Sequence, residues 1–366
     1  MNNKVLYVLA LLPNLRPSNG VSSFIMNYFR RLDHARIHID FALYYDRETP
    51  YYDEIMKISD SKIFILESVR SYKTHIMQCR SILGEGHYDV IHDHTLLISW
   101  PMMNEAKKMG IPVRVLHSHN SKLGETRYKL VRNTVLLPYL KKTANRFAAC
   151  SNDAGRVMFG SEPFTVIPNI IDETKYKFDH NMREKIRYKY GVHGKKVILT
   201  VGRVAEQKNP FFAVDVIEQL AKIDDIEYWW IGSGPLDEKL QKYVKAKNLE
   251  HIIRIFGNQN DVIDYYQAAD LFFLPSLFEG LAIVIIEAQA LGLPCVISDV
   301  ITDEVIYTDL VKKYSLQKKP SEWAFVLNEI LKNKENRHNY NEALKQSTYS
   351  SKNAQETLLA LYDWPY

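Results

Sequence analysis

Short apolar runs bounded by polar and turn residues recur along the chain, and longer amphipathic stretches lie between them. Apolar runs of about four to eight residues are typical of buried strands, whereas periodic stretches of about ten residues or more predict helices. The regular alternation of the two predicts parallel sheets flanked by helices, which is an α/β fold. In the first half of the chain we expect strands at Val5–Leu12, His38–Tyr44, Lys62–Leu66, Tyr88–His94, Val113–Leu116 and Arg146–Ser151, with helices at Val21–Leu32 and Thr74–Leu83.

The second half of the chain repeats this pattern. Its apolar strand Leu271–Leu274 is followed by a run of core residues from Gly280 to Leu291, which predicts a helix that Gly292 and Pro294 end. We expect the other elements there to be strands at Lys196–Val201, Glu227–Ile231, Ile253–Gly257 and Cys295–Ile297, and helices that begin near Pro210 and span Asp261–Ala269, Trp323–Lys332 and Arg337–Leu361.

The chain has 366 residues, which is too many for one ordinary domain, so we expect two α/β domains. The segment Thr174–Lys195 is rich in Lys, Arg, Asp and Tyr, which indicates an interdomain linker followed by the first helix of the second domain. We therefore predict a first domain of residues 1–172 and a second domain of residues 173–349.

Composition and charge restrict the class of protein. The net charge of +4 is a mild basic excess that does not by itself indicate nucleic-acid binding. The three cysteines, Cys79, Cys150 and Cys295, have no disulfide or metal-site spacing, which is typical of buried thiols in a reducing cytosol. No apolar run reaches the ~18 residues of a membrane span, and the apolar start of the chain predicts a first strand rather than a signal peptide.

Two glutamates mark the stretch that follows Leu271–Leu274. Glu279 precedes the predicted helix, and Glu287 lies eight positions later within it. On a continuous helix this spacing would place the two carboxylates roughly 80° apart around the axis and about 12 Å apart along it. That separation exceeds the ~5–9.5 Å at which two carboxylates act as acid and base on one bond. The pair is better suited to hold two ends of an extended polyhydroxyl ligand, while the N–H groups of Gly280 and Leu281 would bind an anion between them.

A second candidate anion site follows the strand Lys196–Val201. Arg203 and Lys208 stand between the carboxyl end of this strand and the helix that begins near Pro210. Two fixed cations beside the free N–H groups of a helix start form a clamp suited to a pyrophosphate. The sequence therefore predicts a phosphate-binding site at this edge of the second sheet.

These motifs resemble those of one enzyme family. EGLAIVIIEA, which begins at Glu279, matches the E-x7-E motif of the retaining glycosyltransferases of family 4, which have the GT-B fold. The wider stretch EGLAIVIIEAQALGLPCVISD, followed by ITDEV, resembles the branch that builds bacterial exopolysaccharide and capsule. GRVAEQK, which begins at Gly202, matches the family motif G-R-x4-K, and the tetrapeptide that begins at Gly232 resembles its G-x-G-P loop.

The resemblance implies a GT-B fold, with two Rossmann-like domains whose parallel sheets face an interdomain cleft. It also implies transfer of a hexosyl group from a nucleotide diphosphate sugar, expected to be a UDP-sugar, with retention of configuration. In the family the first domain binds the acceptor, often a lipid-linked glycan such as a polyisoprenyl diphosphate, and the last helix crosses back onto that domain, here Ser350–Tyr366. Because fixed cations would neutralise the leaving diphosphate, we expect no metal and no cofactor beyond the donor itself.

The family's residue roles carry over to individual positions of this chain. Arg203 and Lys208 would neutralise the diphosphate, Glu279 would hold the hydroxyls of the donor sugar, and Glu287 would hold the ribose. The first loop carries over only in part, since Asn19-Gly20 stands where the family has two glycines, and Ile170 replaces the usual glycine of a later turn. The donor-site residues that the resemblance implies are Gly20, Gly202, Arg203, Lys208, Gly232, Asn258, Glu279, Gly280, Leu281 and Glu287.

Two H-x-H motifs end neighbouring strands of the first domain. The family carries one histidine at the end of the second of these strands, facing the donor sugar, and His117 and His119 both fit that position. Spacing cannot separate them, because residues two apart on a strand point to the same side. For His92 and His94 we expect a structural or acceptor-side role, and no metal, since a zinc shell would be incomplete.

The segment Lys122–Arg146 carries seven basic residues against one acid, Glu125, with apolar residues between them. Two interpretations remain open: an amphipathic helix that contacts an anionic membrane surface, or a core helix with a solvated basic face. The lipid-linked acceptors of the family favour the first, which would place a cytoplasmic enzyme peripherally on the inner face of the plasma membrane.

Two other functions fit part of the pattern. A nucleotide-dependent oxidoreductase would also use doubly wound domains, but no G-x-G-x-x-G follows the first strand. A non-catalytic sugar-nucleotide or glycolipid binder acting with a partner would not need the complete set of Arg203, Lys208, Glu279 and Glu287. The sequence therefore favours a hexosyltransferase.

Overall fold

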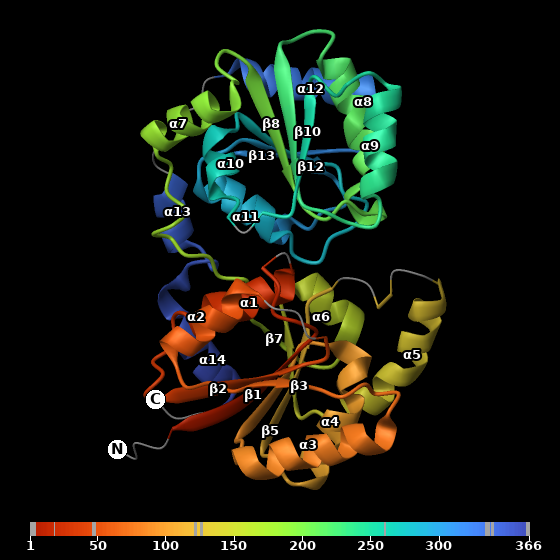
Figure 1. Ribbon diagram of the computed structural model, residues 1–366, viewed down its shortest axis with the longest axis vertical. Helices are drawn as coiled ribbons and strands as arrows, with labels where there is room; N and C mark the ends of the chain where they lie inside the picture. Colours follow the sequence, from red (N-terminus) through yellow and green to blue (C-terminus); the bar gives the residue numbers. More distant parts are fainter. Residues whose placement is uncertain are drawn as a thin grey trace. The chain divides into compact units, whose positions relative to one another are not determined.

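The computed structural model describes residues 5–17, 19–45, 49–120, 123–124, 127–259, 261–333, 337 and 340–363. It divides into two compact units, the first made of residues 1–170 and 351–366 and the second of residues 171–350 (Figure 1). Each unit contains one sheet, and every strand pair in both sheets is parallel.

In the first unit the described residues form a seven-stranded sheet with the order β3-β2-β1-β4-β5-β6-β7. Its strands are β1 Leu6–Leu12, β2 Ile37–Leu43, β3 Ile63–Ile65, β4 Val90–Asp93, β5 Val113–Ser118, β6 Arg146–Ala149 and β7 Thr165–Val166. Its helices are α1 Gly20–Phe29, α2 Pro50–Ile58, α3 Tyr72–Gly86, α4 Trp100–Lys108, α5 Arg127–Lys141, α6 Asn152–Phe159 and α14 Ala354–Leu361, with the short 3-10 helices η1 Leu96–Ser99 and η5 Ser351–Asn353.

In the second unit the described residues form a six-stranded sheet with the order β10-β9-β8-β11-β12-β13. Its strands are β8 Lys196–Val201, β9 Ile226–Ile231, β10 Ile253–Gly257, β11 Leu271–Leu274, β12 Cys295–Ser298 and β13 Val311–Tyr314. Its helices are α7 His180–Tyr190, α8 Pro210–Leu220, α9 Asp237–Ala246, α10 Ile263–Ala268, α11 Ile283–Ala290, α12 Pro320–Lys332 and α13 Tyr340–Gln346, with the 3-10 helices η2 Glu206–Lys208 and η3 Asp303–Val305.

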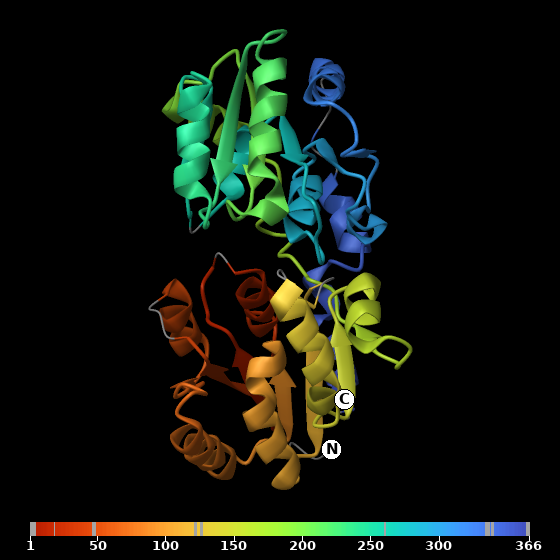
Figure 2. The same ribbon diagram turned by 90° about the vertical axis from the view of Figure 1, so that its right-hand side faces the viewer.

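Burial on both faces explains why the strands read as continuous apolar runs. Along β8, Val197 and Leu199 pack into a core that includes residues of α10 and α11, whereas Ile198 packs on the other side with residues of α8 and α12. Helices accordingly cover both faces of each sheet (Figures 1 and 2). In the first unit, α14 adds Leu358 and Leu361 to the core that contains β1 and α1.

The structure corrects two of the predicted helices. The helix predicted from Gly280 begins at Ile283, because the N–H of Ile283 bonds to the carbonyl of Leu281 in a tight turn, 2.9 Å away. The single helix predicted over Arg337–Leu361 is divided into α13 and α14. At the break, the hydroxyl of Ser347 accepts the N–H of Tyr349, and such a local bond competes with the helical one.

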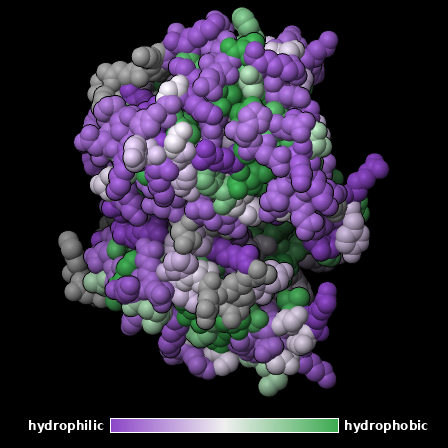
Figure 3. Space-filling model, turned by 45° about the horizontal axis from the view of Figure 1, so that its top comes forward, coloured by the Kyte–Doolittle hydropathy of each residue, from purple (hydrophilic) through white to green (hydrophobic). Residues whose placement is uncertain are grey.

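Strand β13 was not predicted, because its two central residues, Lys312 and Lys313, interrupt the apolar pattern. It is an edge strand, where polar side chains are tolerated. On the face of the molecule that Figure 3 shows, hydrophilic residues predominate and hydrophobic ones form scattered patches. Across the described ranges, no helix combines the length and apolar character that a bilayer span requires.

Candidate active site

The predicted site residues of the second unit follow the two central strands of its sheet. The chain runs from β8 outward to β9 and β10, and then returns to β11 on the other side of β8. In open parallel sheets, ligands bind beyond the carboxyl ends of the strands where the strand order reverses in this way. Gly202, Arg203 and Lys208 follow β8, and Glu279 follows β11, so all four lie beyond the carboxyl ends of these strands at this point.

Lys208 and Glu279 form an ion pair across these two loops. The Nζ of Lys208 lies 2.6 Å from Oε1 of Glu279, and their side chains are 12% and 6% exposed. Gln207 donates to the other oxygen of Glu279 at 3.1 Å, and its backbone carbonyl accepts the N–H of Leu277 at 2.8 Å. An anionic ligand at Lys208 would therefore compete with Glu279. Arg203, by contrast, has an exposed side chain.

Glycines allow the loops after β8 and β9 to touch through their backbones. Gly232 has φ of +128°, and a Cβ there would lie 2.3 Å from the carbonyl oxygen of Gly202. A Cβ on Gly234 would lie 2.2 Å from the carbonyl oxygen of Val204. Any larger residue at Gly232 or Gly234 would separate the two loops, so both glycines of the G-x-G-P motif have one steric cause.

The loop after β10 joins the same edge. The N–H of Gly232 donates to the carbonyl of Gly257 at 2.7 Å, and the side chain of Asn258 accepts the N–H of Ser233 at 3.0 Å. The structure thus brings Gly202, Gly232 and Asn258 together with the Lys208–Glu279 pair at the carboxyl edge of one sheet.

Glu287 lies on α11 and accepts two phenolic hydrogen bonds. Tyr176 donates to Oε1 at 2.7 Å, and Tyr266 donates to Oε2 at 3.0 Å. Burial raises the pKa of Glu287 to about 7, while the two phenols lower it. Glu279 stands outside the helix, so the separation worked out for two glutamates on one continuous helix does not apply.

The residues of the predicted anion site, Gly280 and Leu281, do not lie at the start of a helix. Both residues lie in the loop before α11 rather than in its first turn. Their N–H groups are therefore not part of the helix terminus, and the helix dipole argument does not apply to them.

In the first unit, the two H-x-H motifs form one buried cluster of four rings. His92 bonds to His117 at 3.0 Å, and His94 bonds to His119 at 2.8 Å. His92 also bonds to the hydroxyl of Tyr362 on the segment that follows α14, at 2.8 Å. Burial lowers the pKa of all four histidines, to about 3 for His92 and His119, so the cluster is neutral at pH 7.

Three of these rings lie close enough to one another to act as ligands of one metal ion. Ligand atoms of His92, His94 and His117 lie within 4.8 Å of one another. Both ring nitrogens of His92 are already hydrogen-bonded, so its participation would break the bond to His117 or to Tyr362. The geometry thus fits a hydrogen-bonded cluster better than a preformed ligand set.

Gly20 opens α1 in the loop after β1, the corresponding position in the first sheet. The side chain of Asn19 caps this helix by accepting the N–H of Val21 at 2.9 Å. A Cβ on Gly20 would meet no described atom within 4 Å, so no packing within the described residues requires glycine here.

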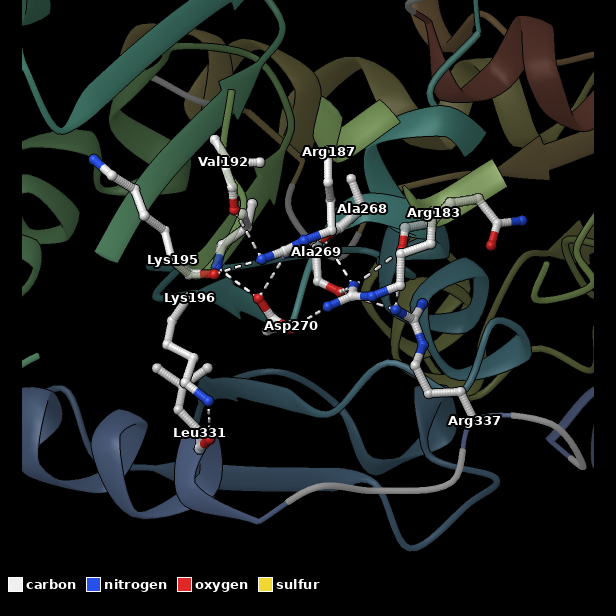
Figure 4. Close-up of polar contacts among 12 residues, drawn as sticks. Arg183, Arg187, Val192, Lys195, Lys196, Ala268, Ala269, Asp270, Leu331 and Arg337 are labelled. Carbon is white, nitrogen blue, oxygen red and sulfur yellow. Dashed lines mark hydrogen bonds and ion pairs between the residues drawn. The ribbon is translucent and has the colours of Figure 1, made fainter. Parts of the chain in front are cut away.

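Charged residues at the opposite edge of the second sheet have a structural role. Asp270, just before β11, accepts from Arg183 at 2.5 Å and from Arg187 at 3.0 Å (Figure 4). Arg337 is buried and donates to the backbone carbonyl of Ala269 at 2.8 Å. These guanidiniums satisfy carbonyls at the end of α10 and fix the start of β11.

Sequence reasoning missed Gln207, Tyr176 and Tyr266. Gln207 adjoins Lys208 in a 3-10 turn, and its position next to a predicted site residue could have identified it from the sequence. The two tyrosines carry no local signal, because they reach Glu287 from positions 111 and 21 residues away along the chain.

Two parallel sheets with Rossmann-type strand order, and glycine-built loops at a reversal of that order, define a two-domain α/β protein of the GT-B class. The family "Glycosyl transferases group 1" matches residues 182–347, and the family "Glycosyltransferase Family 4" matches residues 18–175. EpsF of Bacillus subtilis (strain 168), a glycosyltransferase by name, is 30% identical over 338 residues, which are 88% of this chain and 87% of EpsF.

Two further proteins resemble the chain. The Escherichia coli UDP-Gal:alpha-D-GlcNAc-diphosphoundecaprenol alpha-1,3-galactosyltransferase is 29% identical over 60% of each chain. The crystal structure of Anabaena Alr3699/HepE in complex with UDP and glucose has a TM-score of 0.79, with 16% identity, and covers 97% of this chain and 99% of that one.

The chain therefore belongs to the family 4 glycosyltransferases with the GT-B fold, and it is a transferase. This confirms the resemblance, the predicted fold class and the predicted enzyme class, and it removes the oxidoreductase alternative.

Proposed function

We propose that the enzyme transfers a hexosyl group, with retention of configuration, from a UDP-sugar to a lipid-linked or growing glycan in exopolysaccharide or capsule synthesis. The observation that carries this proposal is the assembly of Gly202, Lys208, Gly232, Asn258 and Glu279 at one edge of the second sheet. A glycosyltransferase of similar fold is known with bound UDP-glucose, and a relative takes a diphosphoundecaprenol-linked acceptor by its name.

In this proposal the two cations have different tasks. Arg203 is exposed and ready to meet the diphosphate, whereas Lys208 exchanges its bond with Glu279 for one with the leaving phosphate. Glu279, released from Lys208, then holds hydroxyls of the donor sugar. Charge on the leaving group is neutralised by side chains of the chain itself, so the reaction does not depend on a divalent cation.

Either His117 or His119 is proposed to lie against the donor sugar. Both rings are neutral, because burial lowers the pKa of each. The Nε2 of His117 is buried with no hydrogen-bond partner among the described residues. His119 is the more exposed of the two residues, and its Nε2 is bonded to His94.

A transfer assay tests the donor and the acceptor together. Purified enzyme is incubated with radiolabelled UDP-glucose, UDP-galactose or UDP-N-acetylglucosamine and an undecaprenyl-diphosphate-linked sugar, and the lipid product is extracted. We expect one donor to label the lipid, and Glu279→Gln to abolish the labelling. The anomeric configuration of the product, read by NMR, tests retention. Labelling from GDP- or ADP-linked sugars alone would refute the UDP assignment.

Helix α5 supports the further proposal of contact with an anionic membrane. Its apolar residues Tyr128, Val131, Val135 and Tyr139 are 75%, 64%, 61% and 59% exposed. They recur every three or four positions, so they form one stripe, roughly 180° around the helix from the buried Asn133, Leu137 and Leu140. An outward apolar stripe beside basic residues is the pattern of a helix that lies in a lipid interface.

Ion pairs limit which basic residues near α5 are available for contact with the membrane. Lys141 is paired with Glu162 and its side chain is only 18% exposed. Arg146 is paired with Asp363. Neither is therefore a good membrane ligand, and the contact is expected to rely on the stripe together with residues such as Arg132 and Lys142.

Vesicle co-sedimentation at low salt tests the contact. Wild-type enzyme should sediment with phosphatidylglycerol vesicles but not with phosphatidylcholine vesicles, since basic residues near an anionic surface contribute ~1 kcal/mol each. The double variant Val131→Ser, Val135→Ser should remain in the supernatant, whereas Phe325→Ser, which removes another exposed apolar side chain on α12, should not change binding. Equal sedimentation of the two variants would mean that the apolar stripe of α5 is exposed to solvent and does not contact the membrane.

A further inference from the structure

The carboxylate of Glu287, a predicted site residue, is held by two tyrosines. This inference rests on the proposed function, in which the second unit binds a nucleotide sugar. We propose that Tyr176 and Tyr266 are positioning residues that fix the Glu287 carboxylate in one orientation and favour its charged form, so that it can accept hydrogen bonds from two adjacent hydroxyls of the donor nucleotide.

The hydrogen-bond geometry supports this role. Tyr176 donates to one carboxylate oxygen at 2.7 Å. The hydroxyl of Tyr266 lies 3.0 Å from the other oxygen and 3.1 Å from the carbonyl of Val284, so its one proton is shared between these two acceptors. An ionised carboxylate has about four lone-pair sites, so each oxygen of Glu287 retains one after these bonds. Two free lone pairs on one plane match the two donor hydroxyls of a vicinal diol such as a ribose.

The tyrosines come from two different parts of the unit, and both are anchored. Tyr176 lies in the segment before α7, where Asn341 donates to its backbone carbonyl at 2.8 Å. Tyr266 lies on α10, is fully buried, and has its backbone carbonyl bonded to Arg337 at 2.9 Å. Since the backbone at both tyrosines is anchored, the carboxylate that their phenols hold is oriented before the ligand arrives.

The charge of Glu287 depends on the same bonds. Burial raises its pKa to about 7, Tyr176 and Tyr266 lower it, and the negative charge of Asp261 raises it. Among the described residues these are the titratable groups that act on Glu287. A protonated Glu287 would carry a donor of its own and could not accept from two hydroxyls, so loss of one phenol would favour the form that binds poorly.

A titration without ligand tests the effect on charge directly. The carboxyl stretch of Glu287 is identified by infrared difference spectroscopy as the band absent from Glu287→Gln, and it is followed against pH. We expect a midpoint near pH 7 in the wild type and a midpoint about one to two units higher in Tyr176→Phe, which is the effect of one hydrogen bond to a charged group. An unchanged midpoint in Tyr176→Phe would overturn the proposal.

Binding of UDP-glucose tests the consequence. This probe is suitable because its diphosphate diester keeps the same charge across the neutral range. Tyr176→Phe should raise the Kd about tenfold at pH 7, and the deficit should shrink as the pH rises and Glu287 ionises again. A loss that is the same at every pH would indicate a merely structural role for Tyr176 and would overturn the proposal.

Tyr190→Phe is the matched control. Its hydroxyl lies 3.3 Å from the hydroxyl of Tyr265 in the same core and does not touch Glu287. It should leave both the infrared midpoint and the pH profile of binding unchanged, and a shift equal to that of Tyr176→Phe would count against the proposal. If UDP-glucose fails to bind the wild type while the infrared midpoint still moves in Tyr176→Phe, the assignment of the donor is wrong and the positioning of Glu287 by Tyr176 stands.

Discussion

Replacement of Glu287 by glutamine should change how the stability of the second unit depends on pH. Burial raises the pKa of Glu287 from 4.5 to about 7 in the folded protein. Between these values the folded state binds a proton that the unfolded state does not, so the raised pKa stabilises the protein fully below about pH 4.5. That stabilisation is lost as the pH rises through about 7.

The size of the effect follows from the shift. Each pKa unit corresponds to about 1.36 kcal/mol, so the shift of Glu287 corresponds to about 3 kcal/mol. Glutamine does not titrate, yet it has nearly the same shape, and its amide can accept from one tyrosine and donate to the other. The wild type should therefore lose about 3 kcal/mol of unfolding free energy relative to Glu287→Gln between about pH 4.5 and about pH 8.

Urea denaturation followed by tryptophan fluorescence measures this difference. Trp229, Trp230 and Trp323 are fully buried in the second unit, so their emission reports on its unfolding. Comparing the two proteins at each pH cancels the contributions of all other titratable groups. A difference in unfolding free energy that stays constant across the range would refute the argument, because Glu287 would then have the same pKa in the folded and unfolded states.

The remaining predictions concern catalysis and the structural core. Arg203→Ala and Lys208→Ala should each lower turnover at saturating donor by at least ~10²-fold, since each removes a charge partner of the leaving group; near wild-type initial rates in both would place the diphosphate clamp elsewhere. Activity should survive dialysis against EDTA, and loss that Mg²⁺ or Mn²⁺ restores would contradict the metal-independent mechanism. Asp270→Asn should destabilise the second unit by ~3–5 kcal/mol in urea, because Arg183 and Arg187 would lose their shared partner, whereas Asp303→Asn, which removes an exposed ion pair with Lys313, should cost less than about 1 kcal/mol.

The sequence by itself determined the apolar strands and the motif positions. Strands such as Lys196–Val201 are buried on both faces and read as continuous apolar runs, so the run alone locates them, and the structure gives that strand the predicted bounds. The G-R-x4-K and G-x-G-P motifs were also readable, because each depends on a local requirement. Gly232 illustrates this requirement, since its φ of +128° is a backbone conformation that residues with a side chain rarely adopt.

The start of the helix predicted from Gly280 was wrong, because a tertiary contact competes there with the local apolar pattern. The run from Gly280 to Leu291 has no polar interruption before Glu287, so it reads as one helix from its first residue. In the structure Glu279 is held by Lys208 and Gln207 from the loop after β8, and the chain turns at Leu281 before α11 begins. A pattern of apolar residues carries no information about such a partner.

Only the tertiary structure decided which of the separated residues meet. Lys208 reaches Glu279 across 71 residues because β8 and β11 are neighbours in the sheet, and Tyr176 reaches Glu287 across 111 residues. Spacing could not separate His117 from His119, since both point to the same side of a strand. In the structure β4 lies beside β5, so that His92 bonds to His117 and His94 bonds to His119. Strand order, which no local pattern encodes, sets these partners, and the partners set the charge and orientation of the site.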